Sequence, residues 1–121
     1  MSTALVVDDS ATDLEIIVSC LQQHGITVIT ARSGEEALVK VSNHKPDIIF
    51  LDVVLPGSSG FEVCREIKNK IETSKIPVII CSTKGSEMDK FWGMKQGADA
   101  YLPKPVDQAE ILRTMKNLLA A

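Results

Sequence analysis

Five short apolar runs constrain the fold of this 121-residue chain more than any other feature of its sequence. They cover residues 4–7, 28–31, 48–51, 78–81 and 100–102. The first, third and fourth runs are continuously apolar and do not alternate with polar residues. Continuous apolar strands are typical of a parallel sheet that helices cover on both faces. The runs therefore predict a buried parallel sheet of five strands.

The stretches between the runs have the spacing of amphipathic helices. Ser10 is suited to cap the first helix and Gly25 to end it. Ser33 with Glu36 forms the pattern of a capping box at the start of a second helix. The first helix carries an apolar stripe at i, i+3, i+4 and i+7, made of Leu14, Ile17, Val18 and Leu21.

Similar signals predict three further helices, which begin near Ser59 or Gly60, at about residue 86, and near Asp107. Residues 72–76 are expected to form a loop. The resulting order, (βα)5, is expected to fill residues 1–121 as a single domain with no output domain. Right-handed crossovers make it an α/β fold with a doubly wound parallel sheet. Its commonest strand order is 2-1-3-4-5, which gives a flavodoxin-like three-layer sandwich.

Acidic residues directly follow two of the runs. Asp8 and Asp9 come after the first run, and Asp52 comes after the third. These strands flank the expected topological switch point, where doubly wound sheets bind ligands. Three carboxylates there would repel one another without a cation, and oxygen ligands suit Mg²⁺ (or Mn²⁺). We expect Asp9 and Asp52 to bind the metal directly, Asp8 directly or through water, and the Val54 backbone carbonyl to complete the protein ligands.

A free oxygen of Asp52 beside such a metal can act as a nucleophile toward phosphorus and form an acyl phosphate. Lys104, after the fifth run, would neutralise charge on the transferred group together with the metal. Ser82 directly follows the fourth run, at the end of the predicted strand, where its hydroxyl could hydrogen-bond a phosphoryl oxygen, and Thr83 is a second candidate. The sequence therefore predicts a phosphoryl-accepting site.

Each of these signals has a simpler explanation when it is taken alone. An Asp-Asp pair before a helix often compensates the helix dipole. A single Asp after a strand is often a turn residue, and a Lys-Pro pair indicates little. Their joint position at three or four strand ends favours a site. The sequence contains no G-x-x-x-x-G-K-[ST] and no G-x-G-x-x-G motif, so nucleotide binding has no support.

Composition narrows the possible partners. The net charge is −3 and no basic block occurs, which argues against a nucleic-acid partner. No apolar run approaches the ~20 residues that span a membrane, and the first residues lack the pattern of a secretion signal. Cys20, Cys64 and Cys81 lack metal spacing and are expected to be buried free thiols. These features predict a cytoplasmic protein without membrane contact.

As a set, these residues resemble the receiver domains of two-component response regulators. The resemblance covers residues 5–119 and rests on V-D-D, L-D-V-V-L-P-G, the Ser82 hydroxyl, Tyr101 and a K-P pair. It implies that Asp52 is the phosphoacceptor and that Asp8 and Asp9 form the Mg²⁺ site.

The same resemblance implies a switch. Lys104 would contact the phosphoryl group, and the Lys104–Pro105 peptide bond is expected to be cis. Ser82 would move toward the phosphoryl group and Tyr101 would turn inward, which changes the face made by the fourth helix, fifth strand and fifth helix. Trp92 is expected either on or near that face or, alternatively, in the core with Phe91 and Met88.

A narrower resemblance is carried by S-T-K at 82–84 and by D-K-F-W-G-M-K-Q-G-A-D-A-Y-L-P-K-P-V at 89–106. Stand-alone receivers of type IV pilus chemosensory systems, which govern twitching motility or phototaxis, have similar segments. Ser59 departs from the Asp or Asn that often precedes Gly60 in the family, and little change in chemistry is expected. Val54 lies at a position that tunes the acyl-phosphate lifetime, and its apolar side chain predicts a long-lived phosphoryl group.

Three functions are compatible with these residues. The first is a response regulator that a histidine kinase or phosphotransfer domain phosphorylates, and that acts on a downstream motility or signalling protein as a monomer or phosphorylation-dependent dimer. The second is a phosphate sink for a shared kinase. The third is an aspartyl-phosphate phosphatase or phosphotransferase. Asp8-Asp9-Ser10 does not match the D-x-D-x-T pattern of such hydrolases, so no enzyme beyond slow self-dephosphorylation is expected.

Overall fold

The computed structural model describes residues 2–120, which contain one parallel sheet of five strands. The strand order is β2-β1-β3-β4-β5, as predicted. Four strands extend one residue beyond the apolar runs, because main-chain pairing does not require an apolar side chain. The strands are β1 (Thr3–Val7), β2 (Thr27–Ala31), β3 (Ile48–Leu51), β4 (Val78–Ser82) and β5 (Ala100–Pro103).

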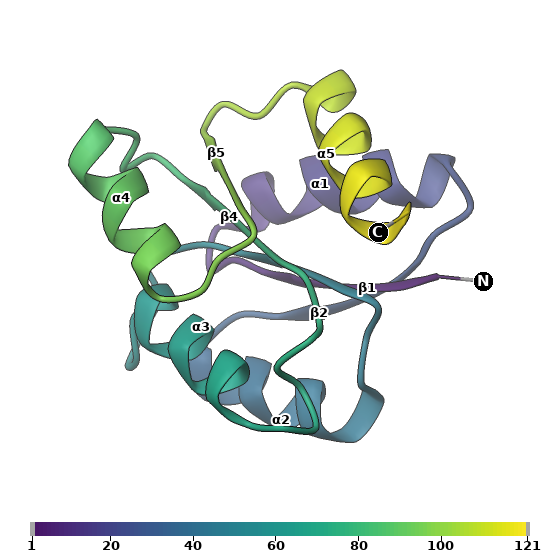
Figure 1. Cartoon of the computed structure of the whole chain (residues 1–121). Helices are drawn as coiled ribbons and strands as arrows, with labels where there is room; N and C mark the ends of the chain where they lie inside the picture. Colours follow the sequence, from purple (N-terminus) through teal and green to yellow (C-terminus); the bar gives the residue numbers. More distant parts are fainter. Residues whose placement is uncertain (1, 121) are drawn as a thin grey trace.

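Helices cover both faces of the sheet and complete the predicted three-layer sandwich (Figure 1). On one face lie α1 (Ala11–Gln23) and α5 (Gln108–Ala120). On the other lie α2 (Gly34–His44) and α3 (Gly60–Asn69), with α4 (Glu87–Lys95) beside α3 and against β5. The segment between α3 and β4 is a series of turns, as predicted for residues 72–76.

Successive strand residues point to opposite faces, which explains the continuous apolar runs. In β1, Leu5 and Val7 pack with α2 and α3, whereas Ala4 and Val6 pack with α1 and α5. Every residue of β3 and β4 is buried. Burying one Val or Ile side chain stabilises a fold by roughly 1.5–3 kcal/mol. The central strands therefore need apolar residues on both faces.

Serine residues cap four of the five helices, but the predicted capping box of α2 is only half formed. The Ser33 hydroxyl accepts from the Glu36 N–H at 3.1 Å. The Glu36 carboxylate accepts instead from the Arg32 N–H at 2.7 Å and pairs with Lys40 at 3.0 Å. Lys40 lies one turn further along α2, so the Glu36 carboxylate pairs with its charge. The neutral Ser33 N–H, which a capping box would use, does not replace this partner. Complete capping boxes occur at the starts of α3 and α4.

The register of the central strands brings the acidic residues to one level of the sheet. Val7 of β1 pairs with Leu51 of β3, so the next residue of each strand is an aspartate. The Asp52 N–H donates to the Val7 carbonyl at 3.0 Å, and the Asp8 N–H donates to the Ala31 carbonyl at 3.1 Å. Main-chain hydrogen bonds therefore continue past the strand ends and fix where both side chains begin.

Candidate functional site

Three carboxylates meet at the carboxyl edge of the sheet. Asp8, Asp9 and Asp52 each place an oxygen within 4.8 Å of the others. Asp8 and Asp52 are 1% and 7% exposed, whereas Asp9 is exposed to solvent. Oxygen donors of this kind, with one side open to water, suit a Mg²⁺ ion that keeps several of its waters. The convergence predicted for these three residues is confirmed.

Lys104 reaches into the same cluster from the segment that follows β5. Its Nζ lies 2.7 Å from Asp8 Oδ2, 3.0 Å from Asp13 Oδ2 and 3.3 Å from Asp52 Oδ2. Burial favours a lower pKa for the ammonium. The hydrogen bonds to Asp8 and Asp13, with the charges of Asp52 and Asp8, outweigh it and raise the pKa of Lys104 above its ordinary value. Lys104 therefore stays positively charged at any physiological pH.

The two oxygens of Asp52 have different surroundings. Oδ1 accepts from the N–H of Val53 at 2.7 Å and of Val54 at 3.4 Å. Among the described residues, Oδ2 has one hydrogen bond, the 3.3 Å contact to Lys104. Burial raises the pKa of Asp52, the Lys104 charge lowers it, and the Asp8 charge raises it again, with a net increase. Oδ2 is thus the oxygen available to react.

The loop after Asp52 is held tightly against the acceptor. The Gly60 N–H donates to the Val53 carbonyl at 2.8 Å. A Cβ on Gly60 would lie 2.0 Å from the Asp52 carbonyl oxygen, so no larger residue fits there. Further along the loop, the Ser58 N–H and hydroxyl donate to Glu35 at the start of α2. The side chain of Val54 is 53% exposed in this loop. Metal binding by the backbone carbonyl of Val54 stays a prediction.

Ser82 and Tyr101 are connected through the main chain of Lys84. Ser82 is fully buried at the end of β4, and its hydroxyl accepts from the Lys84 N–H at 3.2 Å. The Tyr101 hydroxyl donates to the Lys84 carbonyl. Burial and the Asp89 charge raise the pKa of Tyr101, which keeps this hydroxyl protonated. Thr83, the second candidate, is exposed on the bend that follows β4.

The start of the Lys104 side chain is fixed by its backbone. The Lys104 N–H donates to the Ser82 carbonyl at 2.9 Å, which continues the pairing of β4 with β5. The Lys104–Pro105 peptide bond is cis, as predicted. Ser82 and Lys104 are therefore neighbours at the same edge of the sheet.

Asp13 is a member of this cluster that the sequence did not identify as a site residue. Its position in the sequence indicates only an acidic residue in the first turn of α1. Its side chain pairs with Lys104, which lies 91 positions away in the sequence. The available signal was its spacing: Asp13 lies in the first turn of the helix that follows Asp8 and Asp9, so it faces the same edge of the sheet.

Helix α4 exposes several large apolar side chains. Phe91 and Trp92 are 55% and 51% exposed, and Met88 is 72% exposed. The alternative that placed these three residues in the core is therefore wrong. Gly93 is the buried residue of this helix. Lys95 Nζ lies 5.5 Å from the centre of the Phe91 ring, a cation–π distance.

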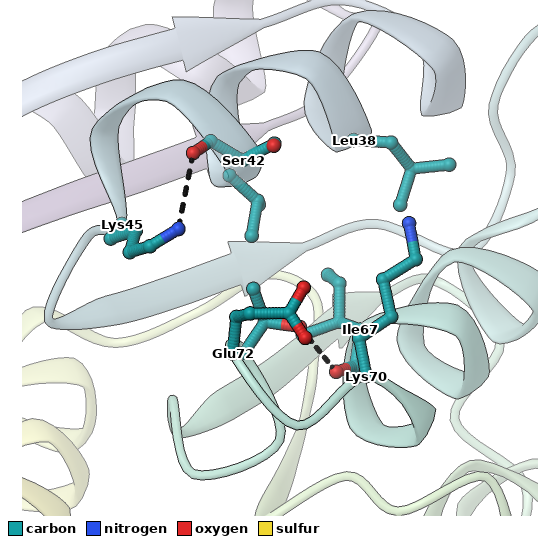
Figure 2. Close-up of a pocket in the computed structure, with 8 residues that line it drawn as sticks. Leu38, Ser42, Lys45, Ile67, Lys70 and Glu72 are labelled. Carbon is teal, nitrogen blue, oxygen red and sulfur yellow. Dashed lines mark hydrogen bonds between the residues drawn. The ribbon is translucent and has the colours of Figure 1, made fainter.

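A separate hollow of about 140 Å³ lies between the carboxyl-terminal halves of α2 and α3. Figure 2 shows Lys70 reaching toward Leu38 across it, and Lys45 donating to the Ser42 carbonyl at its rim. The residues that line it include none of the acidic cluster. These helix ends precede β3 and β4, so the hollow lies away from the strand ends that carry the acids.

The remaining candidate groups have structural positions. Cys20, Cys64 and Cys81 are buried free thiols, as predicted. Burial raises the pKa of Cys64 to about 11 and that of Cys81 to about 12, so both are poor nucleophiles. Among the described residues, no helix is both long and apolar enough to cross a membrane.

Several known proteins are similar to this chain in sequence and fold. Residues 4–116 match the model of the response regulator receiver domain. The chain is 42% identical over 120 residues to Protein PilH of Pseudomonas aeruginosa, with 99% of each chain covered. It is 39% identical over 115 residues to the Bacillus subtilis alkaline phosphatase synthesis transcriptional regulatory protein PhoP. That match covers 95% of this chain and 47% of PhoP. A response regulator structure from Chloroflexus aurantiacus has a TM-score of 0.96 at 35% identity and covers 99% of this chain and 98% of that one.

The chain belongs to the response regulator receiver domain family. Membership agrees with the strand order and with the acidic pocket of Asp8, Asp9 and Asp52, where receiver domains generally bind Mg²⁺. It also implies a histidine kinase or another phosphodonor as partner. The protein is thus a signalling module of the two-component class.

Proposed function

We propose that this chain is a response regulator that accepts a phosphoryl group on Asp52 from a histidine kinase or phosphotransfer domain. The observation that carries the proposal is the asymmetry of Asp52. Main-chain donors hold Oδ1, while Oδ2 has one 3.3 Å contact to a lysine that is always charged. An oriented carboxylate with a free oxygen beside a fixed cation is an activated nucleophile.

The donor set fits a divalent cation. Asp9 and Asp52 would hold Mg²⁺ or Mn²⁺ with the Val54 carbonyl, and Asp8 would bind it directly or through water. The bound metal would supply positive charge against the transferred phosphoryl group. The open side of the site at Asp9 gives the donor access, because that side chain is exposed.

In the transfer step, Asp52 Oδ2 forms a bond to phosphorus as the bond from phosphorus to the donor nitrogen breaks. The leaving electron pair stays on the imidazole of the donor histidine. The Lys104 ammonium faces the phosphoryl oxygens and offsets their charge. The product is an acyl phosphate that adds roughly −1.5 to −2 charge to the site.

This added charge would be sensed at Ser82. Its hydroxyl would turn from the Lys84 N–H toward a phosphoryl oxygen and release one of the two hydrogen bonds that hold the Lys84 main chain. Tyr101 donates the other, so its hydroxyl and ring would follow by turning inward. Because Tyr101 packs against α4, the face made by α4, β5 and α5 would change.

Signalling output through protein contact is favoured over a phosphate sink. Met88, Phe91, Trp92 and Met94 are four large apolar side chains exposed on one short helix. Apolar residues that gather on a surface often mark interaction sites. We propose a downstream motility or signalling protein as the partner, in pilus-based taxis, because of the end-to-end similarity to Protein PilH. We also propose that the protein is cytoplasmic and consists of a single domain. It would be a monomer or form a dimer that depends on phosphorylation.

The acceptor is tested by incubating the protein with acetyl phosphate and Mg²⁺ and measuring the added mass. One phosphoryl group is expected on the wild type and none on Asp52→Asn. The matched control is Asp47→Asn, because Asp47 is an exposed aspartate before β3 at the opposite edge of the sheet. Phosphorylation of Asp52→Asn at the wild-type rate would contradict the assignment.

A separate measurement distinguishes output from a phosphate sink. A partner captured only by the acyl-phosphate-mimic form, and lost in Trp92→Ala, would show an output role. Capture of the kinase alone by both forms would favour the sink.

A further inference from the structure

The Lys104 ammonium lies nearer to Asp8 and Asp13 than to the acceptor. The distances are 2.7 Å to Asp8, 3.0 Å to Asp13 and 3.3 Å to Asp52. Asp8 is already engaged, because its other oxygen accepts from the Ser10 N–H at 2.9 Å. Within residues 2–120, Asp13 is the ion-pair partner of Lys104 that comes from a helix, whereas Asp8 and Asp52 follow strands.

We infer that Asp13 is a positioning residue that holds the Lys104 ammonium at the edge of the site. Lys104 can then face the incoming phosphoryl group without forming the shorter ion pair that would occupy Asp52 Oδ2. The inference rests on the proposed phosphorylation of Asp52 and adds α1 to the elements that prepare it. The lysine side chain is only 8% exposed, so its few carboxylate partners decide where the charge lies.

Loss of the Asp13 charge would act in two opposite ways. Lys104 would keep Asp8 and Asp52 as partners, so it would either pair more closely with the acceptor or lose its fixed position. Both results slow phosphorylation. Removal of a nearby negative charge also reduces repulsion of an anionic donor, which speeds phosphorylation. The sign of the measured change therefore separates positioning from simple electrostatics.

The experiment measures the rate of phosphorylation by acetyl phosphate at saturating Mg²⁺ over a range of donor concentrations. Asp13→Asn is expected to lower the maximal rate about three- to tenfold, with a smaller change in the half-saturating donor concentration. The substitution leaves the helix cap in place, because Ser10 accepts from the backbone N–H of residue 13. Asp13→Glu, which can still reach Lys104, is expected to recover most of the rate.

The matched control is Glu15→Gln, which removes the same charge from the same helix. Glu15 is exposed and accepts from the Ser19 hydroxyl, not from Lys104. We expect its maximal rate to stay within about twofold of the wild type. An equal loss in both variants, or a faster rate in Asp13→Asn, would overturn the inference.

A double-mutant cycle tests whether Asp13 acts through Lys104. In a Lys104→Met background, Asp13→Asn should cause no further decrease in rate, because there is no ammonium left to position. A full additional loss in that background would show that Asp13 acts by another route, and would overturn the inference.

A further readout does not depend on phosphorylation. The ammonium resonance of Lys104 in nitrogen-15 NMR spectra should be protected from rapid proton exchange in the wild type, and in Glu15→Gln, but lose that protection in Asp13→Asn. Unchanged protection in Asp13→Asn would reject the positioning role. If the wild type accepts no phosphoryl group while the resonance responds as expected, the proposed function fails and the positioning of Lys104 by Asp13 stands.

Discussion

Gly93 of α4 lies directly against the ring of Tyr101. A Cβ on Gly93 would fall 2.7 Å from Cδ2 and 2.8 Å from Cε2 of that ring. Both distances are too short for real carbon atoms, so the helix approaches β5 this closely only because position 93 has no side chain. The rotation proposed for Tyr101 would therefore change the contact of its ring with Gly93 of α4.

Gly93→Ala is expected to destabilise the protein by about 1–2 kcal/mol, although alanine favours helix over glycine by about 1 kcal/mol. The cause is the clash with Tyr101, so the same substitution should be neutral or stabilising in a Tyr101→Ala background. Urea unfolding of the four proteins measures both values. An equal loss of stability in the two backgrounds would contradict a role for this contact.

Asp52 is expected to lower the stability of the unphosphorylated protein at neutral pH. Its pKa is raised above the ordinary 3.8 by burial first of all, so the folded state holds the proton more tightly than the unfolded state. Stability from this group therefore falls as the pH rises from 3.8 through the raised value. Asp52→Asn should be more stable than wild type at pH 7, and the difference should vanish below pH 3.8.

Glu35 supplies a control of opposite sign for this pH dependence. Hydrogen bonds from its own backbone and from Ser58 lower the pKa of Glu35. Its contribution is present above the ordinary value of 4.5 and is lost as the pH falls through the lowered value. Glu35→Gln should thus be less stable than wild type at pH 7. A shared sign for the two variants in urea unfolding would refute these assignments.

Mg²⁺ is expected to stabilise the wild type and not Asp9→Asn. A ligand present at about a hundred times its dissociation constant stabilises a protein by about 2.7 kcal/mol. Asp9 is exposed, so its replacement would remove a proposed metal ligand without disturbing the core. Thermal unfolding with Mg²⁺ and with a chelator measures the difference. A rise in melting temperature of equal size in Asp9→Asn would exclude this residue from the metal site.

The acyl phosphate is expected to last for minutes or longer, because the apolar Val54 offers no group to orient an attacking water. Val54 is 53% exposed beside the acceptor, so a polar side chain there would reach the water without repacking the core. Val54→Asn should shorten the half-life about tenfold or more. Loss of radiolabel after donor removal gives the rate. A half-life of a few seconds in the wild type would reject this explanation.

The sheet and the acidic cluster were predictable because both depend on local sequence and chain order. Continuous apolar runs require cover on both faces, and the strand order then brings Asp8 and Asp52 to one edge. Asp13 was not predictable as a partner of Lys104, since that contact depends on where two side chains from distant elements end. An acidic residue in the first turn of α1 can be predicted as a site residue only when the orientation of α1 over the sheet is known.

The environment of Trp92 was also beyond the sequence. A buried helix normally turns its apolar stripe toward the core, but α4 exposes Met88, Phe91 and Trp92, which lie at i, i+3 and i+4, and buries Gly93. No side-chain pattern indicates that a glycine makes the main contact. The capping box predicted at Ser33 is only half formed, because the Arg32 N–H and Lys40 bind the Glu36 carboxylate in place of the Ser33 N–H.

The main chain at Asp52 has little freedom to respond to phosphorylation. Its N–H is bonded to Val7, and its carbonyl oxygen lies against the Cα of Gly60. We therefore expect a new charge on the side chain to cause little shift of β3. In the proposed phosphorylated form, β1 and β3 would hold the acceptor in place, and the structural response would pass through β4 and β5, the strands that carry Ser82 and Tyr101.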